Sequence, residues 1–375
     1  MGDIFSTMKR LAIIIAVSLA LSLAARAHDL DEGLAAYIME DFAAALQEFR
    51  PLAQQGNAEA QYWLATMYAN GYGVPQDTNA AVKWFRMSSE QGYLESQKLM
   101  GQLYDKGLGV PQNSDEAAKW FRMAAEQGDA EAQYLLGFRY LAKQHYAEAL
   151  KWVRMAAEQG ESEAQHALGL MSAAGSGVPK DHSEAVKWFR MAAAQGFGQS
   201  QYQLGLAYYS GDGVPQDHTE SVKWFRMAAA QGSLASQHRL GLAYYFGNGV
   251  PQDHTEGVKW FRTAAEHGSG PSYSLLGLAY YRGEGVSQDY AEAAKWLRMA
   301  VEQGEVAAGG LLGAMYADGT GVPQDYIQAH KWFNLAAARG DEDAAEGRRI
   351  LASNMTPAQI AEAQRLAREW AERNR

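Results

Sequence analysis

The sequence contains no cysteine, and this absence excludes several kinds of chemistry at once. Disulfides, thiolate zinc sites and cysteine nucleophiles cannot form. A lipoprotein anchor requires a cysteine at the point of signal cleavage, so lipidation there is excluded as well. The fold must therefore be held by packing and hydrogen bonds alone, which a sufficiently large core allows.

Long apolar runs are also scarce, and the conspicuous one lies near the N-terminus. Lys9 and Arg10 precede the run LAIIIAVSLALSLAA, and the sequence ARA follows at residues 25–27. A basic start, a short apolar segment and an A-x-A site are typical of a secretory signal peptide. The run is short for a membrane span, which needs about 20 residues. We predict that residues 1–27 are a signal peptide cleaved after Ala27. The mature protein would then be periplasmic or secreted, bacterial, and without a membrane span.

Basic residues are fewer than acidic residues, 33 against 43, which gives a net charge of −10. Removal of residues 1–27 takes away three basic residues and one acidic residue and leaves a net charge of −12. An acidic protein repels nucleic-acid phosphates and anionic membrane surfaces. We therefore predict no nucleic-acid partner.

Repetition is what the sequence has in abundance. The segment GDGVPQDHTESVKWFRMAAAQG at residues 211–232 returns 36 residues later as GNGVPQDHTEGVKWFRTAAEHG. Tryptophans recur every 36 residues, with one spacing of 32, at Trp84, Trp120, Trp152, Trp188, Trp224, Trp260, Trp296 and Trp332. This phase defines eight units at residues 57–92, 93–128, 129–160, 161–196, 197–232, 233–268, 269–304 and 305–340. A period of this length is typical of a solenoid, in which no unit buries its core alone.

Each unit is predicted to contain two helices, and unit 233–268 serves as the example. Its first helix ends at Gly247, because glycine tolerates the left-handed conformation at a helix end. Asp253 begins the second helix as N-cap, and Glu256 three residues later completes a capping-box pattern. Gly268 ends the unit. The second helix is predicted to pack through Trp260, Phe261, Ala264 and Ala265, with the tryptophan as the main packing residue.

A small residue inside the first helix of every unit, such as Gly205 or Gly241, needs a separate reason. Glycine there costs about 1 kcal/mol of helix propensity relative to alanine. We expect the close approach of another helix to offset that cost.

These residues resemble the Sel1-like repeat family, whose pattern is A-x-x-x-L-G-x-x-Y-x-x-G-x-G-V-x-x-D-x-x-x-A-x-x-W-x-x-x-A-A-x-x-G. Unit 197–232 carries it at Ser200, Leu204, Gly205, Tyr208, Gly211, Gly213, Val214, Asp217, Trp224, Ala228, Ala229 and Gly232. The resemblance covers residues 57–340. It implies an all-α fold, a right-handed α/α superhelix of helix-turn-helix units similar to tetratricopeptide arrays.

The ends and one unit depart from the pattern. Residues 28–56 are predicted to be an N-terminal capping half-repeat, and residues 341–375 capping helices with a capping box at Thr356. Unit 129–160 lacks the GxGVPQD turn and closes through LAKQHYAEA instead. We expect a local change of superhelix curvature at that unit.

No motif in the sequence indicates catalysis. His182, His218 and His254 recur in phase, but equivalent positions of stacked repeats do not converge, so no metal site is predicted. The glycine-rich turns lack the lysine and hydroxyl of a phosphate-binding loop. No catalytic triad or metalloprotease motif is present. We predict a protein that is not an enzyme and needs no cofactor.

A second apolar face on the first helices is the candidate binding site. Positions six, ten and thirteen of a unit lie within about 60° of one another on a helix of 3.6 residues per turn. The predicted site residues are Tyr202, Leu206, Tyr209, His238, Leu242, Tyr245, Phe246, Leu278, Tyr281 and Arg282. The first helix lines the concave face in related arrays, and aromatic residues are frequent at binding hot spots. Contact between neighbouring repeats is the competing explanation for this face.

The favoured function is an adaptor that binds a protein or peptide of unknown identity on the concave face. Binding or modification of peptidoglycan or other cell-wall fragments is one alternative, although the cysteines of the relatives linked to that role are missing here. A purely structural spacer is the other alternative.

Overall fold

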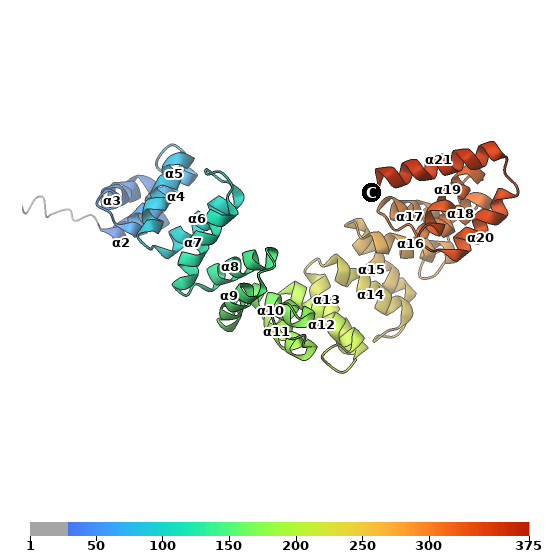
Figure 1. Cartoon of the computed structure of the whole chain (residues 1–375), viewed down its shortest axis with the longest axis horizontal. Coiled ribbons are helices and arrows are strands. Elements are labelled where there is room, and N and C mark those ends of the chain that lie inside the picture. The colour runs from blue at the N-terminus through green and yellow to red at the C-terminus, as the bar shows by residue number, and fades with distance from the viewer. Residues whose placement is uncertain (1–28, 375) are drawn as a thin grey trace, which may run out of the picture. The chain divides into compact units, whose positions relative to one another are not determined.

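The computed structural model describes residues 29–374, so the predicted signal peptide lies outside the described residues. These residues form α-helices joined by short turns, and no strand occurs among them (Figure 1). The chain divides into two compact units, with Ala164 as the last residue of the first and Gln165 as the first residue of the second. The division falls inside helix α10.

The first unit contains α2 (Leu30–Ile38), α3 (Phe42–Gln54), α4 (Ala58–Asn70), α5 (Thr78–Glu90), α6 (Leu94–Lys106), α7 (Ser114–Glu126), α8 (Ala130–Ala142), α9 (Tyr146–Glu158) and the start of α10 (Ser162–Ala174). The second unit contains the rest of α10, then α11 (His182–Ala194), α12 (Gly198–Ser210), α13 (His218–Ala230), α14 (Leu234–Phe246), α15 (His254–Glu266), α16 (Gly270–Arg282), α17 (Tyr290–Glu302), α18 (Ala308–Asp318), α19 (Tyr326–Ala337), α20 (Glu342–Ala352) and α21 (Pro357–Arg373).

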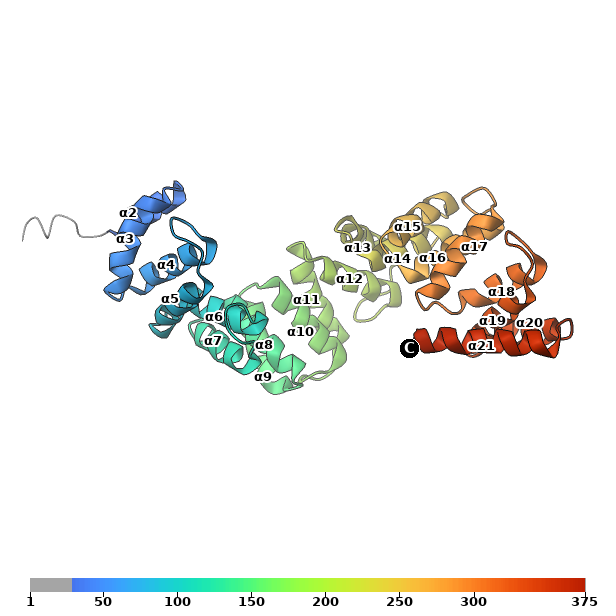
Figure 2. The same ribbon diagram turned by 90° about the horizontal axis from the view of Figure 1, so that it is seen from above.

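Helices pack in the order of the sequence. The two helices of each repeat pack against each other, and within each unit the second helix of one repeat packs against the first helix of the next (Figures 1 and 2). The structure thus confirms an all-α fold of stacked helix pairs. Among residues 29–374, no helix is both long enough and apolar enough to cross a membrane.

The turn chemistry follows the prediction with one correction. Gly211 ends α12 at φ 84°, and the Asp217 carboxylate accepts a 3.0 Å hydrogen bond from the Glu220 backbone N–H at the start of α13. The reciprocal half of the predicted capping box is replaced, because the Asp217 N–H already donates to the Tyr208 carbonyl at 2.8 Å. Glu220 therefore accepts a bond from Lys223 Nζ instead, at 2.7 Å.

The small residue of the first helix has the predicted role. A Cβ placed on Gly205 would lie 2.4 Å from ring atoms of Phe225, and one on Gly241 would lie 2.4 Å from Phe261. The second helix thus lays its phenylalanine directly on the backbone of the first helix. This contact offsets the low helix propensity of glycine.

In α13 and α15 the phenylalanine, and not the tryptophan before it, is the main packing residue. Phe225 and Phe261 are fully buried, whereas Trp224 and Trp260 are only partly buried. Their different burial corrects the prediction. Consecutive residues on a helix point about 100° apart, so only one of the pair can face the glycine of the first helix.

A series of buried glutamines, which the sequence analysis missed, joins consecutive repeats. Gln201 Nε2 donates to the Ala193 carbonyl of the preceding repeat at 3.4 Å, and Gln231 Nε2 donates to Gln201 Oε1 at 2.8 Å. Gln61, Gln97 and Gln133 repeat both contacts in the first unit. The buried carbonyls that end each second helix thereby receive a donor, as buried polar groups require.

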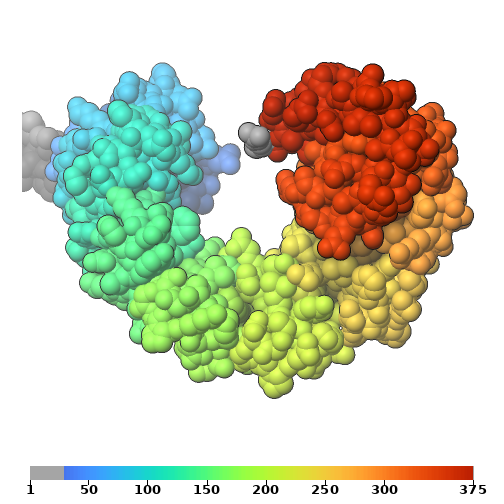
Figure 3. Space-filling model, turned by 45° about the vertical axis from the view of Figure 1, so that its right-hand side comes forward, coloured from blue at the N-terminus to red at the C-terminus, as the bar shows by residue number. Residues whose placement is uncertain are grey.

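The two ends of the chain are helical. The N-terminal segment contains a complete helix pair, α2 and α3, rather than the predicted half-repeat, and the Phe49 ring at its centre is fully buried. At the other end, α21 packs along α19 (Figures 1 and 2), where the Trp370 and Trp332 rings meet edge-on at 6.1 Å. In the space-filling view these last helices form one continuous surface (Figure 3). Thr356 and Gln359 form the predicted capping box.

The unit without the GxGVPQD turn forms α8 and α9, joined only by residues 143–145. Gln144 adopts a positive φ of 59° in this short connection. The change of curvature expected here stays a prediction.

Candidate interaction surface

The residues predicted for the binding face differ in how much of their surface they present. Tyr209, Phe246 and Arg282 are exposed. Partly buried members of the set are Tyr202, Leu206, His238, Leu242, Leu278 and Tyr281. Tyr245 is buried, with 3% of its surface exposed. The row of tyrosines at position thirteen is therefore not uniform.

Tyr245 joins two neighbouring repeats. Its hydroxyl donates to the Glu284 carboxylate of the next repeat, and its ring meets the His254 ring edge-on at 4.5 Å. Burial, followed by the contact with Glu284, raises the pKa of the Tyr245 hydroxyl. Tyr245 is thus a packing residue between repeats, with almost no surface left for a partner.

The histidines that recur in phase pack against this tyrosine row. The Tyr209 ring lies 5.0 Å from the His218 ring, and the Tyr281 ring lies 5.3 Å from Tyr290, which replaces the histidine two units later. Each pair joins the two helices of one repeat. In residues 29–374 no three potential metal ligands come together.

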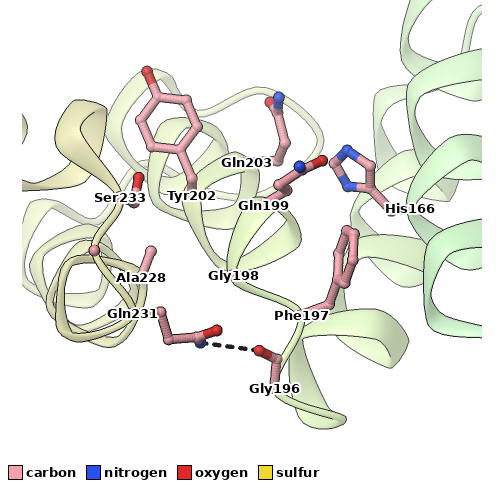
Figure 4. Close-up of a pocket in the computed structure, with 11 residues that line it drawn as sticks. His166, Gly196, Phe197, Gly198, Gln199, Tyr202, Gln203, Ala228, Gln231 and Ser233 are labelled. Carbon is pink, nitrogen blue, oxygen red and sulfur yellow. Dashed lines mark hydrogen bonds between the residues drawn. The ribbon is translucent and has the colours of Figure 1, made fainter.

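A pocket of about 610 Å³ opens around Tyr202 (Figure 4). It lies at the N-terminal end of α12 and is bounded by α10 on one side and by the turn after α13 on the other. The lining residues are His166, Gly196, Phe197, Gly198, Gln199, Tyr202, Gln203, Ala228, Gln231, Gly232 and Ser233. Tyr202 is the member of the predicted site that this pocket contains.

Gly198 contributes no side chain to the floor of this pocket, which leaves the space open. The next repeat has Leu234 at the equivalent position, two residues after the glycine that ends the unit. A Cβ on Gly198 would lie 3.1 Å from Gln231 Oε1, which is close contact but not an overlap that forces the backbone to move. A larger side chain at position 198 would therefore occupy the pocket.

The pocket is polar and aromatic but carries no formal charge near neutral pH. His166 Nδ1 lies 2.9 Å from Ser200 Oγ, and burial lowers the pKa of His166 to about 4, so its imidazole is neutral. Gln231 Nε2 donates to the Gly196 carbonyl at 2.9 Å (Figure 4), while the Phe197 ring lies 5.2 Å from His166. Amide groups beside aromatic rings suit a peptide, whose backbone offers both donors and acceptors.

The serine and histidine pairs on the first helices are not arranged for nucleophilic catalysis. His166 contacts Ser200, and His238 Nδ1 contacts Ser272 Oγ at the same distance of 2.9 Å. Both serines have no exposed surface, so their hydroxyls cannot reach a substrate. These contacts join neighbouring repeats.

Comparison with protein-family models agrees with the repeat geometry. The Sel1 repeat model matches eight consecutive segments, at residues 58–93, 94–129, 130–161, 162–197, 198–233, 234–269, 271–305 and 311–341. The chain belongs to the Sel1 repeat family. Proteins of this family are generally scaffolds for protein interaction and not catalysts.

Two solved structures of bacterial Sel1 repeat proteins are similar over most of the chain. A Sel1 repeat protein from Oxalobacter formigenes is 33% identical, with a TM-score of 0.64, and the match covers 84% of this chain and 93% of that chain. A protective antigen of uropathogenic Escherichia coli with an SLR fold is 28% identical, with a TM-score of 0.54 and coverage of 87% and 94%. Among curated proteins, none matches the chain.

His166 at position six lines the pocket but was not among the predicted site residues. Tyr202 and His238 were singled out there, but the preceding repeat also has a ring at position six, His166. His166 and Tyr202 face the same pocket from successive first helices. The absence of a side chain at Gly198 was the second available signal, because it removes the group that would fill the space between them.

Proposed function

We propose that this Sel1 repeat protein is an extracytoplasmic scaffold that binds a peptide segment of a partner protein in the pocket around Tyr202. The uncharged, amide- and aromatic-lined pocket is the observation that carries the proposal. Its volume of about 610 Å³ lies in the range of 300–1,000 Å³ that ligand pockets usually have. A few residues of extended peptide fit such a space.

Exposed aromatic residues lie at the C-terminal ends of α12 and of the next first helix, α14. Tyr209 is 38% exposed, and the Arg239 guanidinium lies 5.7 Å from the centre of its ring. Phe246 is 55% exposed on the next first helix. Rings of this kind contribute large contact areas at protein interfaces at little cost in side-chain entropy. We infer that the partner segment fills the pocket and extends across these rings.

The location outside the cytoplasm rests on the basic start, the apolar run and the ARA site of residues 1–27. N-terminal sequencing of the exported protein should begin at His28. A first residue at Met1 or Met8 would contradict cleavage.

The binding test uses Gly198→Leu, which places in this repeat the leucine that the next repeat already has. We expect this side chain to fill the pocket and to reduce partner binding at least tenfold, while the melting temperature stays within a few degrees. Gly270→Leu is the matched control, because Gly270 occupies the same position two repeats later. Equal binding by both variants would contradict the role of the pocket.

The partner is identified by photo-crosslinking in the native host, with a photoreactive residue in place of Gln199 on the rim. A protein adduct that disappears in Gly198→Leu supports a peptide-binding scaffold. Binding to purified cell-wall sacculi that survives protease treatment would instead favour recognition of the cell wall. The absence of any specific adduct would favour a structural spacer.

A further inference from the structure

In the regular repeats, the turn that joins the two helices of a repeat fills a groove on the surface of the array. This groove lies between the second helix of one repeat and the first helix of the next. Val214, Val250 and Val286 of successive GxGV turns pack there against Val186, Val222 and Val258 of the preceding second helices. Each turn also rests on the start of that preceding helix. A Cβ on Gly213 would lie only 2.2 Å from the His182 carbonyl oxygen.

In the repeat that contains α8 and α9, this turn is missing and the groove is open. Three residues, 143–145, connect α8 to α9, whereas seven residues, 211–217, connect α12 to α13. The space between α7 and α8 amounts to about 560 Å³. The equivalent space between α13 and α14, covered by its own turn, amounts to about 20 Å³. Ser114 and Ala118 of the open groove stand in the places of His218 and Val222 of the filled one.

The open groove, here called the α7–α8 groove, has an apolar floor and a positively charged rim. Leu135, Ala118 and Phe138 supply apolar surface, and Phe138 is 53% exposed. The charged residues that line the groove are Lys119, Arg122, Arg139, Lys143, Asp105 and Asp115. Four cations face two lining carboxylates and Glu116, which is paired with Lys119, so a local excess of one positive charge remains in a chain whose net charge is −10. Such a groove attracts an acidic partner.

Arg139 is the most unusual residue of the groove. Other repeats have an apolar residue at this position, such as Met171 or Ala243. Its guanidinium lies 2.5 Å from a carboxylate oxygen of Asp105 and 4.4 Å from the centre of the Phe121 ring. Its Nε is buried and has no hydrogen-bond partner. A buried N–H of a charged group costs free energy until an acceptor reaches it.

We propose that the α7–α8 groove binds an acidic segment of a partner protein in a turn conformation, in which a glycine is followed by a small β-branched residue such as valine. The chain's own turns indicate this chemistry, because a Gly-Val pair fills the same groove in the regular repeats. The valine would cover the apolar floor beside Phe138. A carboxylate of the segment would meet Arg139 and Lys119 at the rim. This site is separate from the pocket around Tyr202 and does not depend on the function proposed for it.

The first experiment measures binding of the peptide acetyl-GDGVPQD-amide, the turn at residues 211–217, to the full chain by fluorescence polarisation. We expect saturable binding that weakens at least tenfold for GKGVPQK, which reverses the charge, and for GDGDPQD, which removes the valine. Binding of GKGVPQK as strong as that of GDGVPQD would overturn the proposal, as would no binding of GDGVPQD.

The second experiment closes the groove from within. Replacing residues 143–145 with GDGVPQD gives the irregular repeat the turn of its neighbours, and we expect peptide binding to fall at least tenfold while the melting temperature is kept or raised. Unchanged binding by this folded variant would overturn the proposal.

Crosslinking keeps the test decisive if the variant does not fold. A peptide with a photoreactive group in place of its valine should form adducts with residues 114–143, and adducts elsewhere would overturn the proposal. Sedimentation of the unmodified chain identifies the competing occupant. Concentration-dependent dimers that GDGVPQD dissolves would mean that a second copy fills the groove, and would overturn the assignment to a partner.

Discussion

Replacement of Phe225 by alanine tests which residue holds the two helices of a repeat together. Phe225 is 2% exposed, and its ring lies on the bare backbone of Gly205, where a Cβ would come within 2.4 Å of the ring. Removal of the ring leaves a space that no side chain of α12 at this position can enter. Losses of this type cost about 3–5 kcal/mol.

Trp224 provides the comparison, because it is the residue that recurs most visibly in the sequence. It is only partly buried, and its indole Nε1 is buried without a hydrogen-bond partner. Partial exposure and the unpaired N–H both reduce the contribution of the Trp224 ring to the free energy of unfolding. We expect Trp224→Ala to cost roughly half as much as Phe225→Ala. Phe225→Leu should cost less than about 1.5 kcal/mol, since Leu297 packs on Gly277 in the same way two repeats later.

Native-state hydrogen exchange, read by mass spectrometry, is the suitable assay, because a solenoid need not unfold in a single step. Since 1.4 kcal/mol is a factor of ten, Phe225→Ala should accelerate exchange in α12 and α13 by about two to four orders of magnitude. Helices of the first unit should exchange as before. Faster exchange in Trp224→Ala than in Phe225→Ala would refute the reasoning.

Three further changes test other contacts. His267→Gln should raise the free energy of unfolding by about 0.5–1.5 kcal/mol, because it supplies the missing donor to the buried, unpartnered Gln237 Oε1, and an unchanged urea midpoint would contradict this. Burial lowers the pKa of His166 to about 4, from an ordinary 6.5, so the unfolded chain takes up this proton first. The free energy of unfolding therefore has its full value above about pH 6.5 and decreases as the pH falls toward 4. The melting temperature of His166→Tyr should fall less over this range than that of the unaltered chain. Gly249→Ala should destabilise by at least about 2 kcal/mol, because φ is 78° and the new Cβ would lie 2.2 Å from the His218 carbonyl oxygen, and a neutral thermal melt would refute that close contact.

The candidate surface was only partly predictable. Position thirteen carries tyrosine in three successive units, and nothing in that pattern separates Tyr209 from Tyr245. Burial separates them, because Glu284 of the next repeat accepts the Tyr245 hydroxyl while the Tyr209 ring stays 38% exposed. Likewise, the pocket at Tyr202 depends on a missing side chain at Gly198, and no periodicity of large residues indicates an empty space.

The sequence by itself determined the repeat, the helix boundaries and the all-α class, because these depend on local signals. Gly211 favours the left-handed conformation that ends a helix, Asp217 is a preferred N-cap residue, and a 36-residue period predicts that equivalent faces of successive repeats pack together. Only the tertiary structure decided that Phe225 rather than Trp224 carries the packing, and that the loss of four residues between α8 and α9 leaves a groove open. The packing of Phe225 and the open groove both depend on contacts between helices. These contacts join segments about 20 to 40 residues apart, and their geometry cannot be read from a local sequence pattern.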